Sequence, residues 1–424
     1  MATTAKSDEP DVLRRFLRYA RVHTTSASDK ETAPSTKCQF DLARMLEQEL
    51  KEMGLTDVIL DEHCILIATI PSSMESGYKS LVPAICFIAH LDTSPEEPGE
   101  NVQPRVIMYT GGTITFPANP ALFITPEESP ILSRLVGERL VTADGTTLLG
   151  ADDKAGVAEI MAAASWLVQH PDVRHGEIKL VFTPDEEVGR GVDHLDVKAL
   201  GVDFGFTLDG DELGVIEAEC FNAASGTISI QGYNVHPGYA YGKMINANRV
   251  MRDILAIFPD DAAPETTKDH QGYYHVTRVS GSVNDATVDF ILRDFDQQAL
   301  DAKIQAVKEG ISRVQQRWPG AKISVGFKDG YRNMKAIIDQ KPGVVRIAEA
   351  AIKELGIEPV RKAIRGGTDG ARLSFMGLPC PNLFAGGINF HSKKEFIPVS
   401  WMEKAVQMVL NIIKIVANSK TERM

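Results

Sequence analysis

Five short groups of histidine and acidic residues, far apart in the chain, have types and spacings suited to binding metal ions. In chain order they are His90-Leu91-Asp92, Gly150-Ala151-Asp152-Asp153-Lys154-Ala155-Gly156, Pro184-Asp185-Glu186-Glu187, Asp209 and His391. Zinc accepts imidazole nitrogen and carboxylate oxygen as ligands. Brought together, these side chains supply ligands for two adjacent zinc ions and leave one carboxylate over as a base. Such a set predicts hydrolysis of an amide bond.

The first two groups suggest how a ligand is oriented and how two ions are bridged. His90 can bind a metal through one ring nitrogen while Asp92 accepts the N–H of the other and fixes the tautomer. Glycines on both sides of Asp152 let the backbone turn tightly, which leaves both of its oxygens free, one for each ion. The alternatives are an ordinary His–Asp pair and a turn before a helix that Asp153 caps.

The other three groups carry similar alternatives. Adjacent side chains point in different directions, so one of Glu186 and Glu187 can bind metal while the other faces a substrate. Otherwise the pair is a solvated acidic loop. Asp209 is a ligand or a helix N-cap, and His391, in a glycine-rich turn, is a ligand or a structural histidine. Each alternative suits one group alone, but all five groups in this order would be an improbable coincidence.

Strands that end at these groups would position them. Residues 81–89 form a nearly continuous apolar run before His90, as expected of a strand covered on both faces. Residues 177–183 and 203–208 predict two further strands, which run into the glutamate pair and Asp209. Open α/β sheets bind ligands at the carboxyl ends of their strands. We therefore expect an α/β catalytic domain with a mostly parallel mixed sheet flanked by helices.

Hydrophobic periodicity places the remaining elements of this domain. Helices are predicted at 11–22, 40–53, 155–169, 343–355 and 400–417, and two more strands at 57–60 and 64–70. Gly54 is the expected C-cap of the second helix.

The pattern changes near residue 219. Alternating strands at 225–232 and 286–293 and helices at 245–258 and 298–317 predict an α+β insertion with its own sheet. The expected domains are listed by range: 1–219, first part of the catalytic domain; 220–331, the inserted domain; 332–424, second part of the catalytic domain. A length of 424 residues fits two or three domains.

Composition narrows the class of protein and its surroundings. The formal net charge is −12 without any basic block, which disfavours nucleic acid and anionic membranes as partners. The cysteines number five and none has C-x-x-C spacing, as expected of reduced thiols. The N-terminus has no apolar signal core, and no apolar run approaches the ~18 residues of a membrane span. We expect a cytoplasmic protein without membrane contacts.

Several segments together resemble the peptidase T family of tripeptide aminopeptidases, within the dinuclear-zinc superfamily of aminoacylases, carboxypeptidases and dipeptidases. The resemblance covers about residues 11 to 415. The segments that carry it are His90–Pro95, Asp144–Gly156, Phe182–Glu187, Asn234-Val235-His236-Pro237-Gly238, Pro264-Glu265-Thr266-Thr267 and Arg365-Gly366-Gly367-Thr368-Asp369-Gly370.

The resemblance implies two zinc ions per subunit. His90 and Asp209 would hold one, Glu187 and His391 the other, and Asp152 would bridge them. The peptide bond after this aspartate, Asp152–Asp153, would be cis. It implies Glu186 as the general base and Asp92 as the residue that orients His90. The insertion would be a lid or dimerisation domain, which allows a homodimer, and His236 would reach the carbonyl of a peptide substrate.

Arginines are the natural clamp for the C-terminal carboxylate of a peptide. Arg293 and Arg365 are the candidates, and the alternative for each is a structural ion pair, for instance Arg293 with Asp294 or Asp296. The resulting prediction is a zinc aminopeptidase that releases the N-terminal residue of tripeptides. The alternatives are an N-acyl amino acid deacylase or a dipeptidase of the same superfamily, and, more remotely, a metal-binding protein without catalysis.

Overall fold

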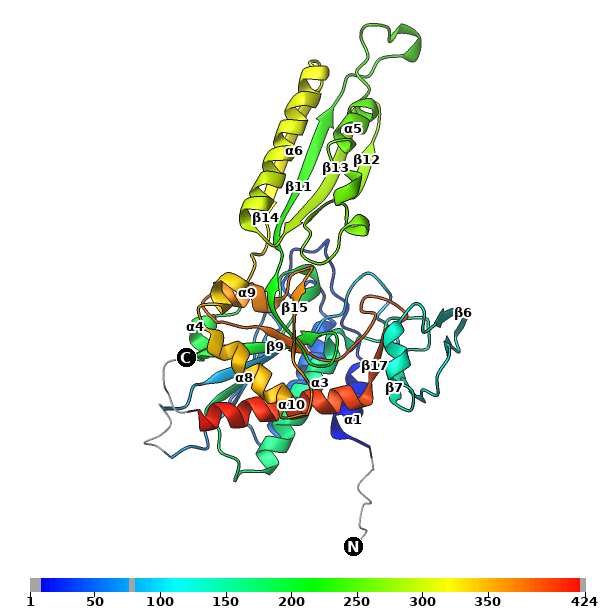
Figure 1. The fold of residues 1–424 in the computed structure, drawn as a ribbon. Coiled ribbons are helices and arrows are strands. Elements are labelled where there is room, and N and C mark those ends of the chain that lie inside the picture. The colour runs from blue at the N-terminus through cyan, green and yellow to red at the C-terminus, as the bar shows by residue number, and fades with distance from the viewer. Residues whose placement is uncertain (1–8, 76–80, 420–424) are drawn as a thin grey trace. The chain divides into compact units, whose positions relative to one another are not determined.

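A computed structural model describes residues 9–75 and 81–419 and divides them into two compact units (Figure 1). Unit 1 takes the described residues up to Ala218, then Ala336–Lys362, and those from Thr368 onward. Unit 2 consists of Glu219–Lys335 and the short segment Ala363–Gly367. The inserted unit thus also includes five residues from the later part of the chain.

Unit 1 is built on an eight-stranded mixed sheet in the order β1-β2-β8-β3-β9-β16-β10-β15. Its four central strands run parallel, and the pairs β1–β2, β2–β8 and β16–β10 are antiparallel. The strands are β1 (Val58–Leu60), β2 (Leu66–Ile70), β3 (Ile85–His90), β8 (Ile178–Thr183), β9 (Phe204–Gly210), β10 (Val215–Cys220), β15 (Val360–Ile364) and β16 (Asn382–Phe384). The predicted α/β class with a mixed sheet is confirmed, with parallel pairing concentrated at the centre.

Helices cover both faces of this sheet. On one side α3 (Ala151–Gln169) lies against β3 and β9, α1 (Asp11–Tyr19) and α10 (Val399–Asn418) lie on α3, and α8 (Pro342–Lys353) lies on α10. Glycine lets α3 approach closely, because a Cβ at Gly156 would lie 2.0 Å from the carbonyl oxygen of Leu208. On the other side, α4 (Val197–Leu200) and α9 (Asp369–Phe375) join a buried apolar cluster with β3 and β8.

Smaller elements complete unit 1. A three-stranded sheet β17-β7-β4 and a β5–β6 hairpin cover a second apolar cluster. The elements are α2 (Gln39–Glu52), β4 (Arg105–Met108), β5 (Ile114–Phe116), β6 (Asn119–Ile124), β7 (Arg139–Thr142), α7 (Lys335–Ile338) at the junction of the units, and β17 (Phe396–Pro398). The strands between residues 105 and 142 were not predicted from the sequence.

Unit 2 has its own core. Its antiparallel sheet has the order β12-β13-β11-β14, and two helices pack on it around buried residues such as Val288, Phe290 and Val307. The elements are β11 (Asn222–Gln231), α5 (Ala247–Leu255), β12 (Tyr273–Gly281), β13 (Asp285–Asp294), α6 (Gln297–Arg317) and β14 (Lys322–Asp329). Alternate residues of β13 are buried, which gives the period of two that the sequence shows.

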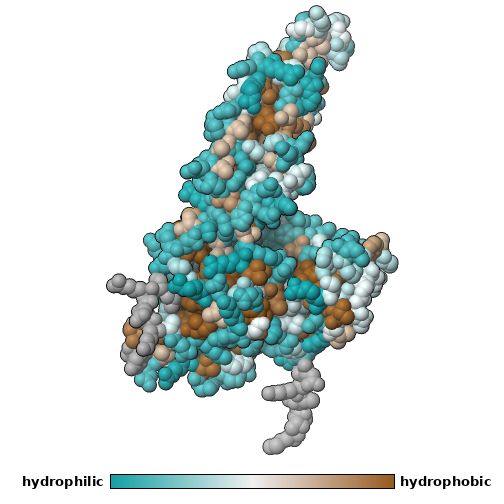
Figure 2. All heavy atoms as spheres, in the orientation of Figure 1, coloured by the Kyte–Doolittle hydropathy of each residue, from teal (hydrophilic) through white to brown (hydrophobic). Residues whose placement is uncertain are grey.

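Most predicted elements are present, with shifted ends. The strand predicted at 81–89 begins only at Ile85, because Pro83 has no N–H to donate to a neighbouring strand. Gly54 has φ +94° and follows α2, as a C-cap glycine does. Within the described residues, none of the helices has the length and apolarity to cross a membrane. The face of the molecule in Figure 2 is mainly hydrophilic, with separate hydrophobic patches.

Candidate metal centre

Strand ends in unit 1 deliver four of the predicted side chains. His90 is the last residue of β3, and Asp209 lies near the end of the adjacent strand β9. Glu186 and Glu187 form a short 3-10 helix just after β8, on the other side of β3. Because these three strands are parallel, their carboxyl ends share one edge of the sheet.

Asp152 lies between the two predicted histidine ligands. Its Oδ1 is 2.9 Å from Nε2 of His90, and its Oδ2 is 3.2 Å from Nε2 of His391. Gly150 before it has φ +78°, and the Asp152–Asp153 peptide bond is cis, as the resemblance implied. One oxygen of a single carboxylate therefore faces each histidine, which is the arrangement of a bridging ligand.

Each histidine has a second carboxylate beside the same nitrogen. Asp209 Oδ1 is 3.6 Å from Nε2 of His90, and Glu187 Oε2 is 2.8 Å from Nε2 of His391. The other oxygen of Glu187 is buried and has no hydrogen-bond partner among the described residues. A buried carboxylate oxygen without a donor is costly, and a cation beside it would remove that cost.

Asp92 supports the centre in two ways. Its backbone carbonyl oxygen is 3.0 Å from Nδ1 of His90, and its carboxylate oxygen Oδ1 is 3.4 Å away. The same carboxylate accepts hydrogen bonds from the backbone N–H groups of Glu186 and Glu187, at 3.0 and 3.2 Å. The main chain of Asp92 thus contributes to orienting His90, and its side chain also fixes the glutamate pair.

Glu186 and Asp153 are close to the ligands but are engaged differently. Glu186 turns toward α9, where its Oε1 accepts a hydrogen bond from the backbone N–H of Asp369 at 3.2 Å. Asp153 lies within ligand distance of His90 and Asp209, yet its two oxygens accept the N–H groups of His90 and Gly156. Asp153 therefore secures the backbone, whereas Glu186 bonds to the start of α9 and is not directed at either histidine.

Burial and crowding perturb the acidic groups of the centre. Burial first and repulsion by Asp152 second raise the pKa of Glu187 to about 8 and that of Asp209 to about 6. Burial and repulsion by Asp209 hold the pKa of Glu186 well above its usual value. Burial opposes the imidazolium of His90, but hydrogen bonds to Asp152, Asp209 and Asp92 outweigh it and raise the His90 pKa.

These side chains fit a pair of divalent cations. Ligand atoms of His90, Asp152 and Glu187 all lie within 4.8 Å of one another, as do those of His90, Asp153 and Asp209. Nitrogen and carboxylate donors suit Zn²⁺, and positive charge would relieve the repulsion that raises the carboxylate pKa values.

Comparisons with known proteins identify the family to which the chain belongs. Residues 142–415 match the model of peptidase family M20/M25/M40. A curated relative, peptidase T of Caldanaerobacter subterraneus subsp. tengcongensis, is 45% identical over 405 residues, 95% of this chain and 98% of the relative. The chain belongs to this peptidase family.

Solved structures show the same fold. A tripeptidase from Staphylococcus aureus matches with a TM-score of 0.77 at 22% identity, over 96% of this chain and 98% of that chain. A protein of Bacillus subtilis, described as a dinuclear metal binding peptidase from the M20 family, matches with a TM-score of 0.63 at 16% identity, covering 96% and 97% of the two chains.

The family match begins after His90 and Asp92, so those two residues are placed by the structure and not by the family model. Unit 2 contains the three predicted substrate residues, each with local partners. His236 is exposed, and its Nδ1 accepts the N–H of Gly238 at 3.2 Å.

The two arginines make their hydrogen bonds inside unit 2. Arg293 donates to the hydroxyl of Tyr331 at 3.0 Å and to two backbone carbonyls. Arg365 donates to the carbonyls of Asp269 and Gln271 and to the Thr267 hydroxyl, and its guanidinium lies over two aromatic rings. These contacts favour a structural role for both, although the partners of Arg293 are not Asp294 or Asp296.

Sequence reasoning assigned no role to several buried acidic residues beside the candidate ligands. Asp185, 1% exposed, accepts hydrogen bonds from the Ser35 backbone and the Gln39 amide and so anchors the segment before Glu186. Asp369 accepts the Thr183 hydroxyl at 2.9 Å, and burial raises its pKa to about 7. Glu395 is also buried beside the centre. Their partners lie over 140 residues away, so local spacing gives no signal for them.

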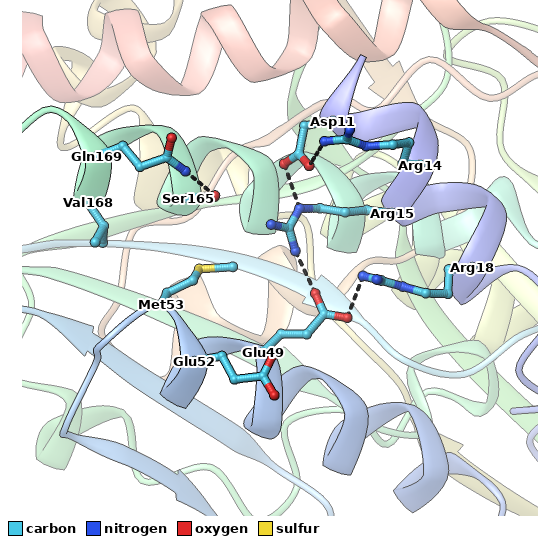
Figure 3. Close-up of a pocket in the computed structure, with 10 residues that line it drawn as sticks. All are labelled: Asp11, Arg14, Arg15, Arg18, Glu49, Glu52, Met53, Ser165, Val168 and Gln169. Carbon is cyan, nitrogen blue, oxygen red and sulfur yellow. Dashed lines mark hydrogen bonds and ion pairs between the residues drawn. The ribbon is translucent and has the colours of Figure 1, made fainter. Parts of the chain in front are cut away.

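A polar cavity of about 570 Å³ lies elsewhere in unit 1, between α1, α2 and α3 (Figure 3). There Arg15 and Arg18 both contact Glu49 at 2.5 Å, and Arg15 also contacts Asp11 at 2.8 Å. These ion pairs join residues that line the cavity, which favours a structural role for it.

Proposed function

We infer that this protein is a tripeptide aminopeptidase, a metal-dependent hydrolase that releases the N-terminal residue of tripeptides. The observation that carries the inference is Asp152, whose two oxygens each face one of the two histidines. The 45% identity to peptidase T over 95% of the chain supports the substrate class.

Two Zn²⁺ ions are the proposed cofactors. His90 and Asp209 would hold one and His391 and Glu187 the other, with Asp152 between them. When bound, such ions lower the pKa of water from ~15.7 toward ~7 and polarise the scissile carbonyl. The donor set also accepts other divalent ions such as Co²⁺ or Mn²⁺, so zinc is a proposal about the native metal.

Glu186 would move the proton. It is the one glutamate of the pair that is not directed at His391, and Asp92 holds its backbone in place. Its carboxylate would accept the proton of the attacking water and then donate it to the departing amine. The raised Glu186 pKa suits a group that must hold a proton between these two steps.

The substrate residues and the surroundings of the enzyme are further parts of the proposal. His236, exposed in unit 2, is the best-placed of the three predicted substrate residues to reach a ligand, since both arginines are engaged. A homodimer through unit 2 and a cytoplasmic location stay predictions. Cys38, Cys64, Cys86 and Cys380 are free thiols, which supports a reducing compartment.

A steady-state comparison tests the function. Purified protein is assayed with di-, tri- and tetrapeptides bearing free termini, and with N-acetyl amino acids, before and after chelation and on return of Zn²⁺. We expect the highest kcat/KM for tripeptides, complete loss with the chelator and recovery with metal. Preference for N-acetyl amino acids or dipeptides would reject the assignment in favour of a deacylase or dipeptidase, and no hydrolysis at all would leave a metal-binding protein.

A further inference from the structure

Glu395 is a fully buried carboxylate, 1% exposed, that lies four residues after His391. Its Oε2 accepts hydrogen bonds from the backbone N–H groups of Leu149 and Gly150, both at 2.8 Å. Its Oε1 accepts the backbone N–H of Asp152 at 3.0 Å. One side chain therefore holds three N–H groups of the turn that carries the bridging aspartate.

The N–H groups of Gly150 and Asp152 lie at the start of α3, where a helix has no intrahelical acceptors for them, and the N–H of Leu149 lies just before it. A buried N–H without an acceptor costs about 1–3 kcal/mol, so the turn needs a partner of this kind. Gly150 adopts φ +78° and Asp152 is not helical, with φ −82° and ψ 106°. The N–H groups of Leu149, Gly150 and Asp152 in this turn therefore depend on Glu395 as their acceptor.

Glu395 is itself held in place. It directly precedes β17, whose Phe396 pairs with Thr142 of β7, and its backbone N–H donates to the Ser392 carbonyl at 3.2 Å. Its buried charge is offset by three N–H donors and by the ammonium of Lys154, which is also buried and donates to the Val22 carbonyl at 2.6 Å. The acceptor thus belongs to a rigid segment.

The same segment carries His391. The loop from His391 to Glu395 therefore contains one proposed metal ligand, His391. Through Glu395 it also forms a hydrogen bond to the backbone of a second proposed ligand, Asp152, more than 240 residues away in sequence. A shift of the turn would move Asp152 Oδ2 away from His391 and Oδ1 away from His90, which are now 3.2 and 2.9 Å distant. Loss of the Glu395 hydrogen bonds should therefore displace Asp152 before it disturbs the main sheet of unit 1.

We propose that Glu395 is a positioning residue for the metal centre: it sets the Leu149–Asp152 turn so that Asp152 faces both cations at once. The proposal rests on the metal centre of the proposed function and does not depend on which peptide is cleaved. It differs from a purely structural role, because it places the effect of Glu395 on cation affinity and not only on the stability of the fold.

Metal titration of the chelator-treated protein tests the proposal. Zn²⁺ is titrated against a chromophoric competing chelator, and Co²⁺ binding is followed by its visible absorption. The variant Glu395→Gln keeps the volume but replaces one acceptor oxygen with an N–H₂ group that faces an N–H. We expect the weaker of the two Zn²⁺ affinities to fall ~10–100-fold, as for other residues that orient metal ligands. The Co²⁺ spectrum should change with it.

Asp61→Asn is the matched control. Asp61 also accepts two backbone N–H groups of a turn in unit 1, those of His63 and Ile65 at 2.9 and 2.8 Å, but that turn carries no metal ligand. Both N–H groups bond the same oxygen, Oδ1, which asparagine keeps as an acceptor, so the control should fold and leave both Zn²⁺ affinities unchanged. Glu395→Asp, which shortens the side chain by one methylene, is the second test variant and should weaken the same cation.

The outcomes separate cleanly. Wild-type affinity for both cations in Glu395→Gln and Glu395→Asp would overturn the proposal, as would an equal loss in Asp61→Asn. Failure of both Glu395 variants to fold would also overturn it, by showing that the residue is needed for the fold itself. Absence of tripeptide cleavage by the wild type would reject the proposed function alone, since the titration is read without substrate.

Discussion

The metal centre of unit 1 and the arginine sites of unit 2 both contain charged side chains packed among protein atoms. They differ in how fully those side chains are hydrogen bonded. At the centre, one buried oxygen of Glu187 has no partner among the described residues, and Asp152, Asp209 and Glu187 lie around two histidine nitrogens. Arg365, by contrast, donates to two backbone carbonyls and a hydroxyl and stacks on Phe221 and Tyr273.

The difference separates chemistry from structure. A polar group whose hydrogen bonds are complete has little capacity left for a ligand, whereas buried groups left incomplete cost free energy unless something binds them. The buried Glu187 oxygen that lacks a partner among the described residues therefore favours a cation site at the centre, whereas the several hydrogen bonds of Arg293 and Arg365 favour a structural role in unit 2. The predictions below test each side of this contrast.

Asp152→Asn should have the largest effect. The amide keeps the shape of the side chain but loses the negative charge that both cations share, so fewer than two should remain bound. Activity on tripeptides should fall to the background of the uncatalysed reaction, as measured by metal analysis and kcat/KM. Asp144→Asn, in the same segment and with a carboxylate that accepts hydrogen bonds from Thr146, is the control and should behave as wild type. Two bound cations in Asp152→Asn would contradict the bridging role.

Glu186→Gln should lower kcat by roughly 10²–10⁴, the usual contribution of a positioned general base. Because Glu186 is directed away from His391, both cations should stay bound, whereas Glu187→Gln should lose one. The measurement is kcat with metal stoichiometry on the same samples. Near-normal turnover in Glu186→Gln would remove the base from its assigned role and leave the contrast between the two glutamates without support.

The sequence was sufficient for the groups that follow apolar strands. His90 and Asp209 end runs of buried residues, so their places at one sheet edge could be derived from strand patterns alone. The Glu186–Glu187 pair follows such a run as well. Because one edge collects all three, convergence could be expected before any coordinates were known.

Residues that support the ligands could not be found in this way. Glu395 reads locally as one acidic residue before an apolar strand, and its role depends on a turn more than 240 residues earlier. The actual partners of Arg293 are Tyr331 and backbone carbonyls, and Asp294 instead pairs with Lys303 at 2.9 Å. Nearest charges in sequence are poor guides once tertiary packing offers other partners. The short strands from β4 to β7 lack the long apolar runs that revealed the central sheet.

Arg365→Lys tests the structural side of the contrast. Lysine lacks the planar fork, so the bonds to Asp269, Gln271 and Thr267 cannot all be kept. At about 0.5–1.5 kcal/mol for each hydrogen bond, we expect a loss of roughly 2–4 kcal/mol in the free energy of unfolding, measured in urea. KM for tripeptides should stay within about twofold. The exposed Arg278→Lys is the control. A tenfold higher KM at unchanged stability would instead make Arg365 the carboxylate clamp.

Glu159 of α3, in unit 1, is a buried carboxyl that does not follow this difference between the metal centre and the arginine sites. It is 0% exposed, and neither carboxylate oxygen has a hydrogen-bond partner in the described part of the chain, yet it belongs to no ligand group. Burial holds its pKa well above the usual value, so the folded protein keeps it protonated. A raised folded-state pKa means that its contribution to stability is complete below the unfolded pKa of about 4.3 and is lost as pH rises.

Glu159→Gln, which cannot ionise, should therefore match the wild type most closely near pH 5 and become the more stable protein by pH 8. The gap can grow by at most ~1.4 kcal/mol per pH unit, and urea unfolding of both proteins at the two pH values measures it. Activity should be unchanged, because Glu159 belongs to neither group of candidate metal ligands. If the unfolding free energies of the two proteins changed in parallel with pH, Glu159 would be ionised and have a counter-charge. A large loss of turnover in Glu159→Gln would mean that this carboxyl also takes part in the chemistry.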